Sequence, residues 1–188
     1  MALAPYAKAT TKNVGGNFNK LYFTEIANIT SVTGGTELTA VTMVGATKFQ
    51  MVTAEIDSVQ MKIEGSGNSN YFNTQTLVMR FAKRSASLTA FINSLTDAVA
   101  CGVAAIRIDG NGIAWLSGFD EQGVDKWARP YNRIKVTHDS GVKPSDENQN
   151  SVIIELSRET EYDEIPFTST VSGYMASQSG SAGWCAYT

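Results

Sequence analysis

Alternation of apolar and polar residues recurs along the chain and predicts short β-strands. The clearest case is residues 58–64, where Val59, Met61 and Ile63 alternate with polar residues. A period of two places neighbouring side chains on opposite faces of an extended chain, so one face of this strand is expected to be buried. Alternation, or an enrichment in aromatic and β-branched residues, predicts further strands over residues 20–30, 38–44, 48–56, 74–81, 103–108, 113–117, 131–137, 151–157 and 165–167.

One segment follows a helical period instead. Its apolar residues fall at i, i+3, i+4, i+7 and i+11, which is one face of a helix: Leu88, Phe91, Ile92, Leu95 and Val99. We therefore expect a helix over residues 87–101, with Ser87 as the N-cap and Gly102 ending it in left-handed geometry. A lone amphipathic helix in a β protein is expected to bury its apolar stripe over an open end of a sheet or barrel.

Turn and loop signals separate these elements. Residues 109–112 (Asp-Gly-Asn-Gly) predict a hairpin turn, and Gly34-Gly35 predicts another turn. Polar or glycine-containing segments predict loops over residues 65–70, 119–129 and 139–150. The fold class that follows is mainly β: an antiparallel β-sandwich or barrel with one flanking α-helix.

Both ends of the sequence lack periodicity. Residues 1–19 and 168–188 are rich in small and polar residues. We expect them to form extended N-terminal and C-terminal arms on a single β domain that spans residues 20–167.

Composition narrows the class of protein. Hydrophobic residues make up 43% of the chain and charged residues 18%, with a net charge of −3. These values argue against a disordered chain, a long-helix protein and a generally basic nucleic-acid coat. The longest apolar run, residues 98–106, is less than half of the roughly 20 residues that cross a bilayer, and the start has no signal-peptide pattern. We expect a cytosol-like compartment, no membrane partner, and unpaired thiols at Cys101 and Cys185.

Candidate chemistry is sparse. His138 is the only histidine, and no nucleophile-elbow sequence accompanies it. The acidic residues of 155–164, such as Glu155 and Glu164, could form a glycosidase pair, but a solvated or partner-facing edge is the simpler interpretation. No catalytic residue and no cofactor site are therefore predicted.

A calcium site is considered at residues 146–150, which have the D-x-N-x-N opening of a calcium loop. The match then fails, because Ser151 replaces the required Gly and Ser157 replaces the closing Glu. A polar turn is the preferred interpretation, and a weak ion site of another kind stays open. No metal site is predicted.

The residues that usually protect the edges of β-sheets from pairing with other chains are also few. Exposed β-edges are usually shielded by charges and prolines, but this chain has 18% charged residues and four prolines. A protein whose function is to associate would use such edges for pairing between subunits. The physical argument therefore favours a self-assembling structural subunit.

The order of elements resembles that of bacteriophage tail-tube subunits and related ring proteins of virions. The resemblance spans most of the chain and is carried by the entry at residues 16–29, the helix to Gly102, the hairpin over 110–118 and the strand over 150–156. One departure is that tube proteins often have a long hairpin loop, which has no clear counterpart here.

The resemblance implies a virion protein that forms rings of six copies, stacked into a hollow tube whose lumen is lined by a sheet of each copy. Its partners would be further copies, other virion proteins, and DNA as passing cargo that the lumen attracts weakly at most. The residues expected to make contacts between subunits are Gly65, Asn68, Asp139, Asp146, Asn148, Tyr174 and Trp184.

Two alternatives stay open. Another virion component, such as a capsid, decoration or connector-ring protein, would share the β architecture and the assembly. A carbohydrate-binding module would instead hold its ligand with exposed aromatic residues, for which Trp115, Trp127 and Tyr131 are the candidates.

Overall fold

The computed structural model describes residues 16–34, 37–65, 73–81, 84–122, 125–138, 151–161 and 163–168. These residues form two β-sheets, a separate hairpin and one α-helix, which confirms the predicted mainly-β class with a single helix. The seven-stranded sheet has the order β2 (Ile29–Gly34), β3 (Leu38–Met43), β13 (Ile165–Phe167), β8 (Ala114–Ser117), β7 (Val103–Asp109), β1 (Asn17–Glu25) and β4 (Gln50–Thr53).

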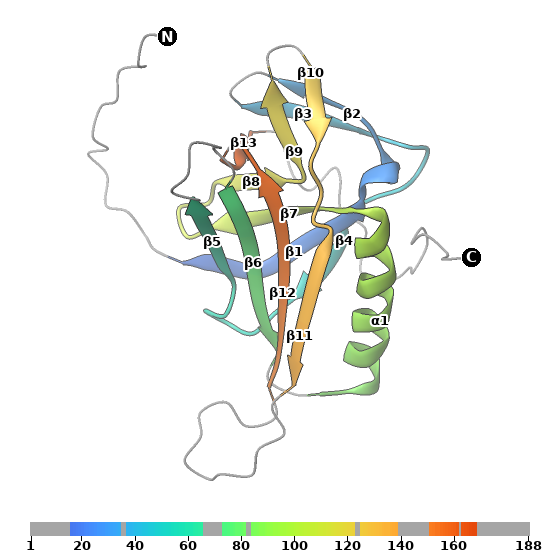
Figure 1. Cartoon of the computed structure of the whole chain (residues 1–188), viewed down its shortest axis with the longest axis vertical. Coiled ribbons are helices and arrows are strands. Elements are labelled where there is room, and N and C mark those ends of the chain that lie inside the picture. Colours follow the sequence, from blue (N-terminus) through green and yellow to red (C-terminus); the bar gives the residue numbers. More distant parts are fainter. Residues whose placement is uncertain are drawn as a thin grey trace.

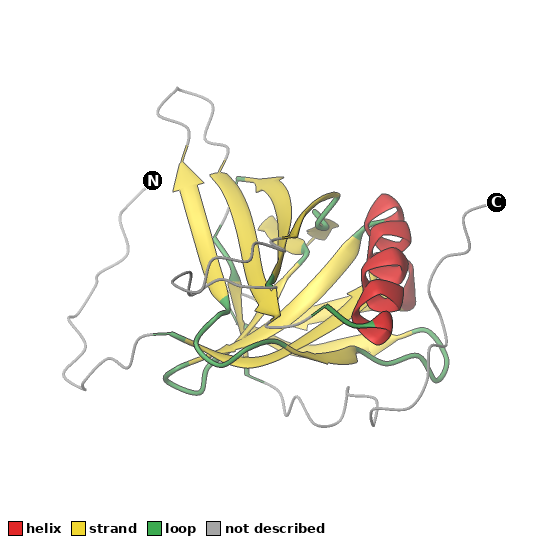
Figure 2. Ribbon diagram, turned by 90° about the horizontal axis from the view of Figure 1, so that it is seen from below, coloured by secondary structure: helices red, strands yellow, loops and turns green. Residues whose placement is uncertain are grey.

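The second sheet has four strands, in the order β11 (Arg133–His138), β12 (Val152–Thr160), β6 (Asn73–Phe81) and β5 (Gln60–Gly65). It lies in front of the seven-stranded sheet in Figure 1, and Figure 2 shows the two sheets as separate layers with helix α1 (Ala86–Cys101) at one side. The helix therefore flanks the sandwich, as the sequence predicts. None of the described helices is long and apolar enough to span a membrane.

The seven-stranded sheet is buried on both faces near its centre. Leu21 and Phe23 of β1 belong to the core that also contains the inner face of the four-stranded sheet and the helix stripe. Tyr22, between them, points the other way into a second core with Ile106 and Leu116. This double burial explains why residues 103–106 form a continuous apolar run rather than an alternating one.

The helix confirms the predicted stripe but corrects its ends. Leu88, Ile92, Leu95 and Val99 are buried, whereas Phe91 is half-buried. The N-cap is Ser85 rather than Ser87: its Oγ accepts a hydrogen bond from the backbone N–H of Leu88 at 3.1 Å. Because the helix begins at Ala86, Ser87 lies inside its first turn.

Gly102 ends the helix with a different geometry from the one predicted. Its φ of 92° is positive, but its ψ of 129° lies outside the left-handed helical region. Glycine is required there for space as well as for φ, because a Cβ atom would lie 2.6 Å from Cγ of Pro130. The chain passes directly from this residue into β7.

Three predicted segments are wrong in detail. The strand expected over 20–30 is interrupted by a 3-10 turn, Ile26–Asn28, where the backbone N–H of Ile26 donates to the carbonyl of Gly102 at 3.0 Å. This turn redirects the chain from β1 to the opposite edge of the sheet. The loop expected over 119–129 contains the hairpin of β9 (Phe119–Gln122) and β10 (Asp125–Ala128). The strand expected over 48–56 is reduced to the four residues of β4.

The last described strand also departs from a purely antiparallel plan. β13 enters between β8 and β3, pairing with β8 in antiparallel register and with β3 in parallel through Phe167 and Leu38. Because β3 and β8 run in opposite directions, a strand between them can be antiparallel to only one. At the other end of the domain, β1 begins at Asn17, inside the segment assigned to the N-terminal arm.

Candidate functional site: an open sheet beside a buried ionic network

The outward side of the four-stranded sheet, which we call the open face, is polar. On the inward side, Leu77, Met79, Ile154 and Leu156 are completely buried. Side chains alternate along a strand, so the residues that alternate with these on β6 and β12 belong to the open face. Their cross-strand partners on β5 and β11 belong to the same face. Its side chains are exposed or half-buried: Gln60, Lys62, Glu64, Thr74, Thr76, Val78, Arg80, Arg133, Lys135, Thr137, Ile153, Glu155, Ser157 and Glu159.

Charges on the open face are nearly balanced and partly paired across strands. Arg133 Nη1 lies 2.7 Å from Glu159 Oε1, and Lys135 Nζ lies 3.2 Å from Glu155 Oε1. Such exposed pairs contribute little to stability, but they cancel each other's field at a distance. The basic residues of the face are Lys62, Arg80, Arg133 and Lys135, and the acidic ones are Glu64, Glu155 and Glu159. A balanced face of this kind has no strong attraction for phosphate.

The two edges of this sheet, β5 and β11, are each paired on one side only among the described strands. Each edge strand has six residues. All three pairings inside the sheet are antiparallel, so the two outermost of its four strands run in opposite directions. Unpaired backbone N–H and C=O groups along such edges are a template for pairing with another chain.

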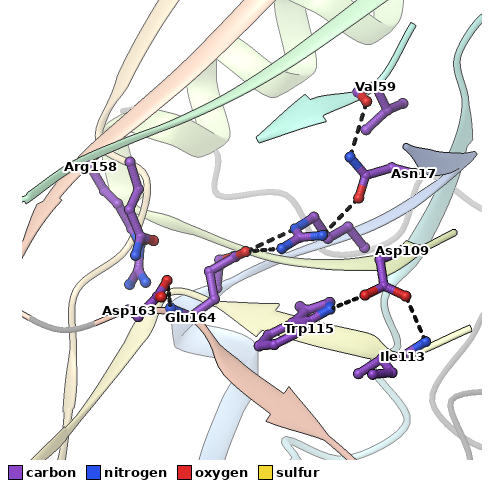
Figure 3. Close-up of polar contacts among 11 residues, drawn as sticks. Asn17, Val59, Asp109, Ile113, Trp115, Arg158, Asp163 and Glu164 are labelled. Carbon is purple, nitrogen blue, oxygen red and sulfur yellow. Dashed lines mark hydrogen bonds and ion pairs between the residues drawn. The ribbon is translucent and has the colours of Figure 1, made fainter. Parts of the chain in front are cut away.

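An ionic network lies between the two sheets (Figure 3). Arg107, on β7, donates from Nε to Glu164 Oε2 at 2.9 Å and from Nη1 to Asn17 Oδ1 at 2.7 Å. The hydroxyl of Ser117 also donates to the Glu164 carboxylate. The side chain of Glu164 is 1% exposed. Since a buried charge is costly unless it is paired, the network holds the start of β13 against β7 and β8.

A second buried polar cluster lies on the inward side of the four-stranded sheet. Arg158, completely buried on the inward side of β12, donates from Nε to Gln75 Oε1 at 2.8 Å and from Nη1 to the carbonyl of Arg129 at 2.9 Å. Its guanidinium lies 5.9 Å from the ring centre of Tyr131. Burial raises the pKa of Tyr131, and the charge of Glu164 adds to that rise. Tyr131 therefore keeps its proton and serves as part of the core.

Asp109 organises the predicted hairpin between β7 and β8. Its Oδ1 accepts hydrogen bonds from the backbone N–H groups of Asn111 and Ile113, both at 2.9 Å, and its Oδ2 accepts one from Nε1 of Trp115 at 3.0 Å. Figure 3 shows the bonds with Ile113 and Trp115. Burial by itself would raise the pKa of Asp109. The hydrogen bonds from Trp115, Ile113 and Asn111, with the charge of Arg107, outweigh it and lower the pKa below the ordinary value.

These contacts weaken two interpretations of the sequence, the glycosidase pair and the carbohydrate-binding module. Glu155 lies on the open face and pairs with Lys135, whereas Glu164 is buried between the sheets, so the two do not form a glycosidase pair. Tyr131 is completely buried, so it presents no surface to a sugar. Trp115 is half-buried, and the guanidinium of Arg107 lies over its ring, 5.4 Å from the ring centre. The side chain of Trp127 lies outside the described residues.

Most of the residues predicted to make contacts between subunits lie outside the described residues. Gly65 is exposed at the end of β5, on an edge of the four-stranded sheet. His138 ends β11 and is exposed. The other candidates, Asn68, Asp139, Asp146, Asn148, Tyr174 and Trp184, lie outside the described residues, as does the calcium-like motif that begins at Asp146. Within the described ranges, no three His, Cys, Asp or Glu residues are grouped closely enough to hold a metal.

Sequence reasoning missed the ionic network, although one signal was present. Arg158 stands two residues after Leu156 and four after Ile154, at the buried positions of an alternating strand. A charged residue at such a position predicts a buried partner. Glu164 had no comparable signal, because the acidic residues around it suggested a solvated edge.

No protein-family model matches the chain. No curated protein matches it significantly either.

Proposed function

We propose that the protein is a structural subunit of a virion that assembles with copies of itself into rings, which stack into a tail tube for the passage of DNA. The observation that carries this proposal is the four-stranded sheet, which has a polar outer face and whose edge strands, β5 and β11, are each paired on one side only among the described strands. The resemblance in element order supports the same conclusion. The chain acts through assembly rather than through a catalytic site.

The direction of the edge strands favours ring closure. Because β5 and β11 run in opposite directions, β5 of one copy can pair in antiparallel fashion with β11 of the next. A rotation about an axis roughly along the strands repeats this contact with the same geometry. Contacts between different surfaces of identical subunits give a closed ring when the rotation closes. The resulting sheet would be continuous and would have no free edge.

The open face suits the lumen of such a ring. Its basic and acidic residues nearly cancel, with Arg133 and Lys135 already paired to glutamates. A strongly basic lining would bind phosphates and slow the passage of DNA. The balanced face would let DNA pass, and α1 would lie on the side away from the lumen.

Negative-stain electron microscopy, with light scattering over a concentration series, tests this proposal. We expect rings or hollow tubes, and a molar mass that rises with concentration to a multiple of one subunit. A second sample in high salt should retain the rings, because backbone pairing is screened less than surface ion pairs. A monodisperse monomer at the highest concentration would overturn self-assembly as the function.

A further inference from the structure

A groove of about 880 Å³ runs along the free side of β4. Residues 51–55, on and just after β4, line it on one side, and Phe81 and the start of α1, including Ser87, Leu88 and Phe91, line it on the other. β4 is the last strand of the seven-stranded sheet and pairs only with β1 among the described strands. The groove is therefore bounded by a sheet edge on one side and a helix on the other.

The backbone of β4 presents hydrogen-bonding groups to this groove. The N–H of Ala54 donates to the carbonyl of Asn19 at 2.8 Å, which makes these two residues a hydrogen-bonded pair. In an antiparallel ladder such pairs alternate with pairs whose N–H and C=O groups point away from the partner strand. By the register, Met51 and Thr53 are residues of the second kind. Their backbone groups face the groove, where no described residue pairs with them.

Two phenylalanine side chains give the opposite wall an apolar part. The rings of Phe81 and Phe91 lie 6.2 Å apart between centres, and both side chains are half-buried. An extended segment in the groove would bond to the backbone of Met51 and Thr53. Its alternate side chains would cover the two phenylalanines. This combination of a backbone ladder and side-chain pockets is how an exposed sheet edge receives an added strand.

We propose that the groove receives residues 169–188 of a second copy of this chain. The inference rests on the proposed function, in which copies are neighbours in an assembly. These residues, which lie outside the described part, contain no charged side chain, so burying their side chains costs no charge desolvation. Residues 1–15, by contrast, carry Lys8 and Lys12. The segment also supplies apolar side chains for the wall: Val171, Tyr174, Met175, Trp184 and Tyr187.

The attachment point and length of the segment allow this contact. Thr168, where the described chain stops, donates its backbone N–H to the carbonyl of Leu38 at 2.9 Å, on the far side of the sheet from β4. From there an extended segment of this length reaches about 60 Å, at about 3.3 Å for each residue. A strand from a neighbouring copy would close the β4 edge and link subunits through a contact separate from the β5 and β11 edges.

Disulfide trapping in the full chain tests the proposal, with Cys101→Ser in every sample so that Cys185 is the remaining native thiol. One copy carries a tag, Ser87→Cys in the groove and Cys185→Ser; the second copy keeps Cys185 and is untagged. Ser87 lines the groove and is exposed, so the new thiol is accessible. After mixing and mild oxidation, we expect a disulfide-linked heterodimer on a non-reducing gel.

Two variants of the tagged copy show whether the bound segment pairs with the backbone edge of β4. Thr53→Pro removes an N–H that points into the groove and leaves the ladder with β1 intact, a position where strands tolerate proline. Thr53→Ala keeps that N–H. We expect the heterodimer to be lost with Thr53→Pro and retained with Thr53→Ala, while circular dichroism and the thermal midpoint show that both variants fold.

The remaining outcomes separate this inference from the proposed function. Rings in the microscope without a heterodimer would overturn the inference and leave the ring proposal standing. A cross-link formed only within one chain, in a copy that carries both Ser87→Cys and Cys185, would also overturn it. A heterodimer sensitive to Thr53→Pro in a sample without rings would support the inference and count against the tube.

Discussion

Glu164 is the residue on which the packing of the start of β13 against β7 and β8 depends most directly. Replacing it by Gln keeps the shape but removes the charge that compensates Arg107, whose side chain is 12% exposed. Breaking a buried ion pair in this way costs about 3–5 kcal/mol. We therefore expect Glu164→Gln to lower the free energy of unfolding by about that amount in urea titrations.

Glu159→Gln is the matched control for this prediction. Glu159 also pairs with an arginine, Arg133, but the two side chains are 52% and 60% exposed. An exposed pair contributes between 0 and about 1 kcal/mol. Equal losses of stability in the two variants would show that Glu164 is not held in a buried network.

Asp109 makes the stability of the hairpin between β7 and β8 depend on pH. Its folded-state pKa is lowered, so its contribution to stability is complete above the unfolded-state pKa of about 3.9 and is lost as pH falls through the folded-state pKa. We expect the stability advantage of the wild type over Asp109→Asn to shrink between pH 6 and pH 3. Urea unfolding at both pH values measures it, and an advantage that stays constant would contradict the assignment.

At the scale of elements, the start of α1 distinguishes the sequence prediction from the structure. Ser85 accepts the N–H of Leu88, whereas Ser87 is exposed in the first turn. Losing an N-cap serine costs about 1 kcal/mol. We expect this loss for Ser85→Ala and a change below about 0.5 kcal/mol for Ser87→Ala in thermal or urea unfolding. A larger loss of stability for Ser87→Ala than for Ser85→Ala would show that Ser87 is the N-cap.

At the scale of the whole molecule, assembly should depend on the β5 edge. Ile63 on β5 is 42% exposed. Natural sheets block unwanted pairing by placing lysine on an edge strand. We expect Ile63→Lys to abolish rings in negative-stain images while the monomer keeps its thermal midpoint within a few degrees of the wild type.

Ile113→Lys is the control for the edge. Ile113 has a similar exposure, 45%, but it lies in the turn between β7 and β8 rather than on the four-stranded sheet. We expect this variant to assemble like the wild type. If both lysine variants assembled normally, pairing through β5 would be excluded as the ring contact.

Much of the fold could be predicted because its signals are local. The alternation over Ser58–Glu64, the spacing of Leu88, Ile92 and Leu95, and the Asp-Gly-Asn-Gly turn each depend on a few consecutive residues. The structure confirms a strand, a helix stripe and a hairpin at these places. Helix ends were less predictable, because Ser85 and Ser87 are both acceptable caps by type.

By itself, the sequence determined most of the strand segments, the place of the one helix and the low share of charged residues. Only the tertiary structure decided which strands pair. The pairing of β13 with β3 joins Phe167 and Leu38, which are more than a hundred positions apart, and no local pattern encodes such a pairing. The same holds for Arg107 and Glu164: each looks like an ordinary charged residue, and folding makes them a buried pair because both are withdrawn from water together.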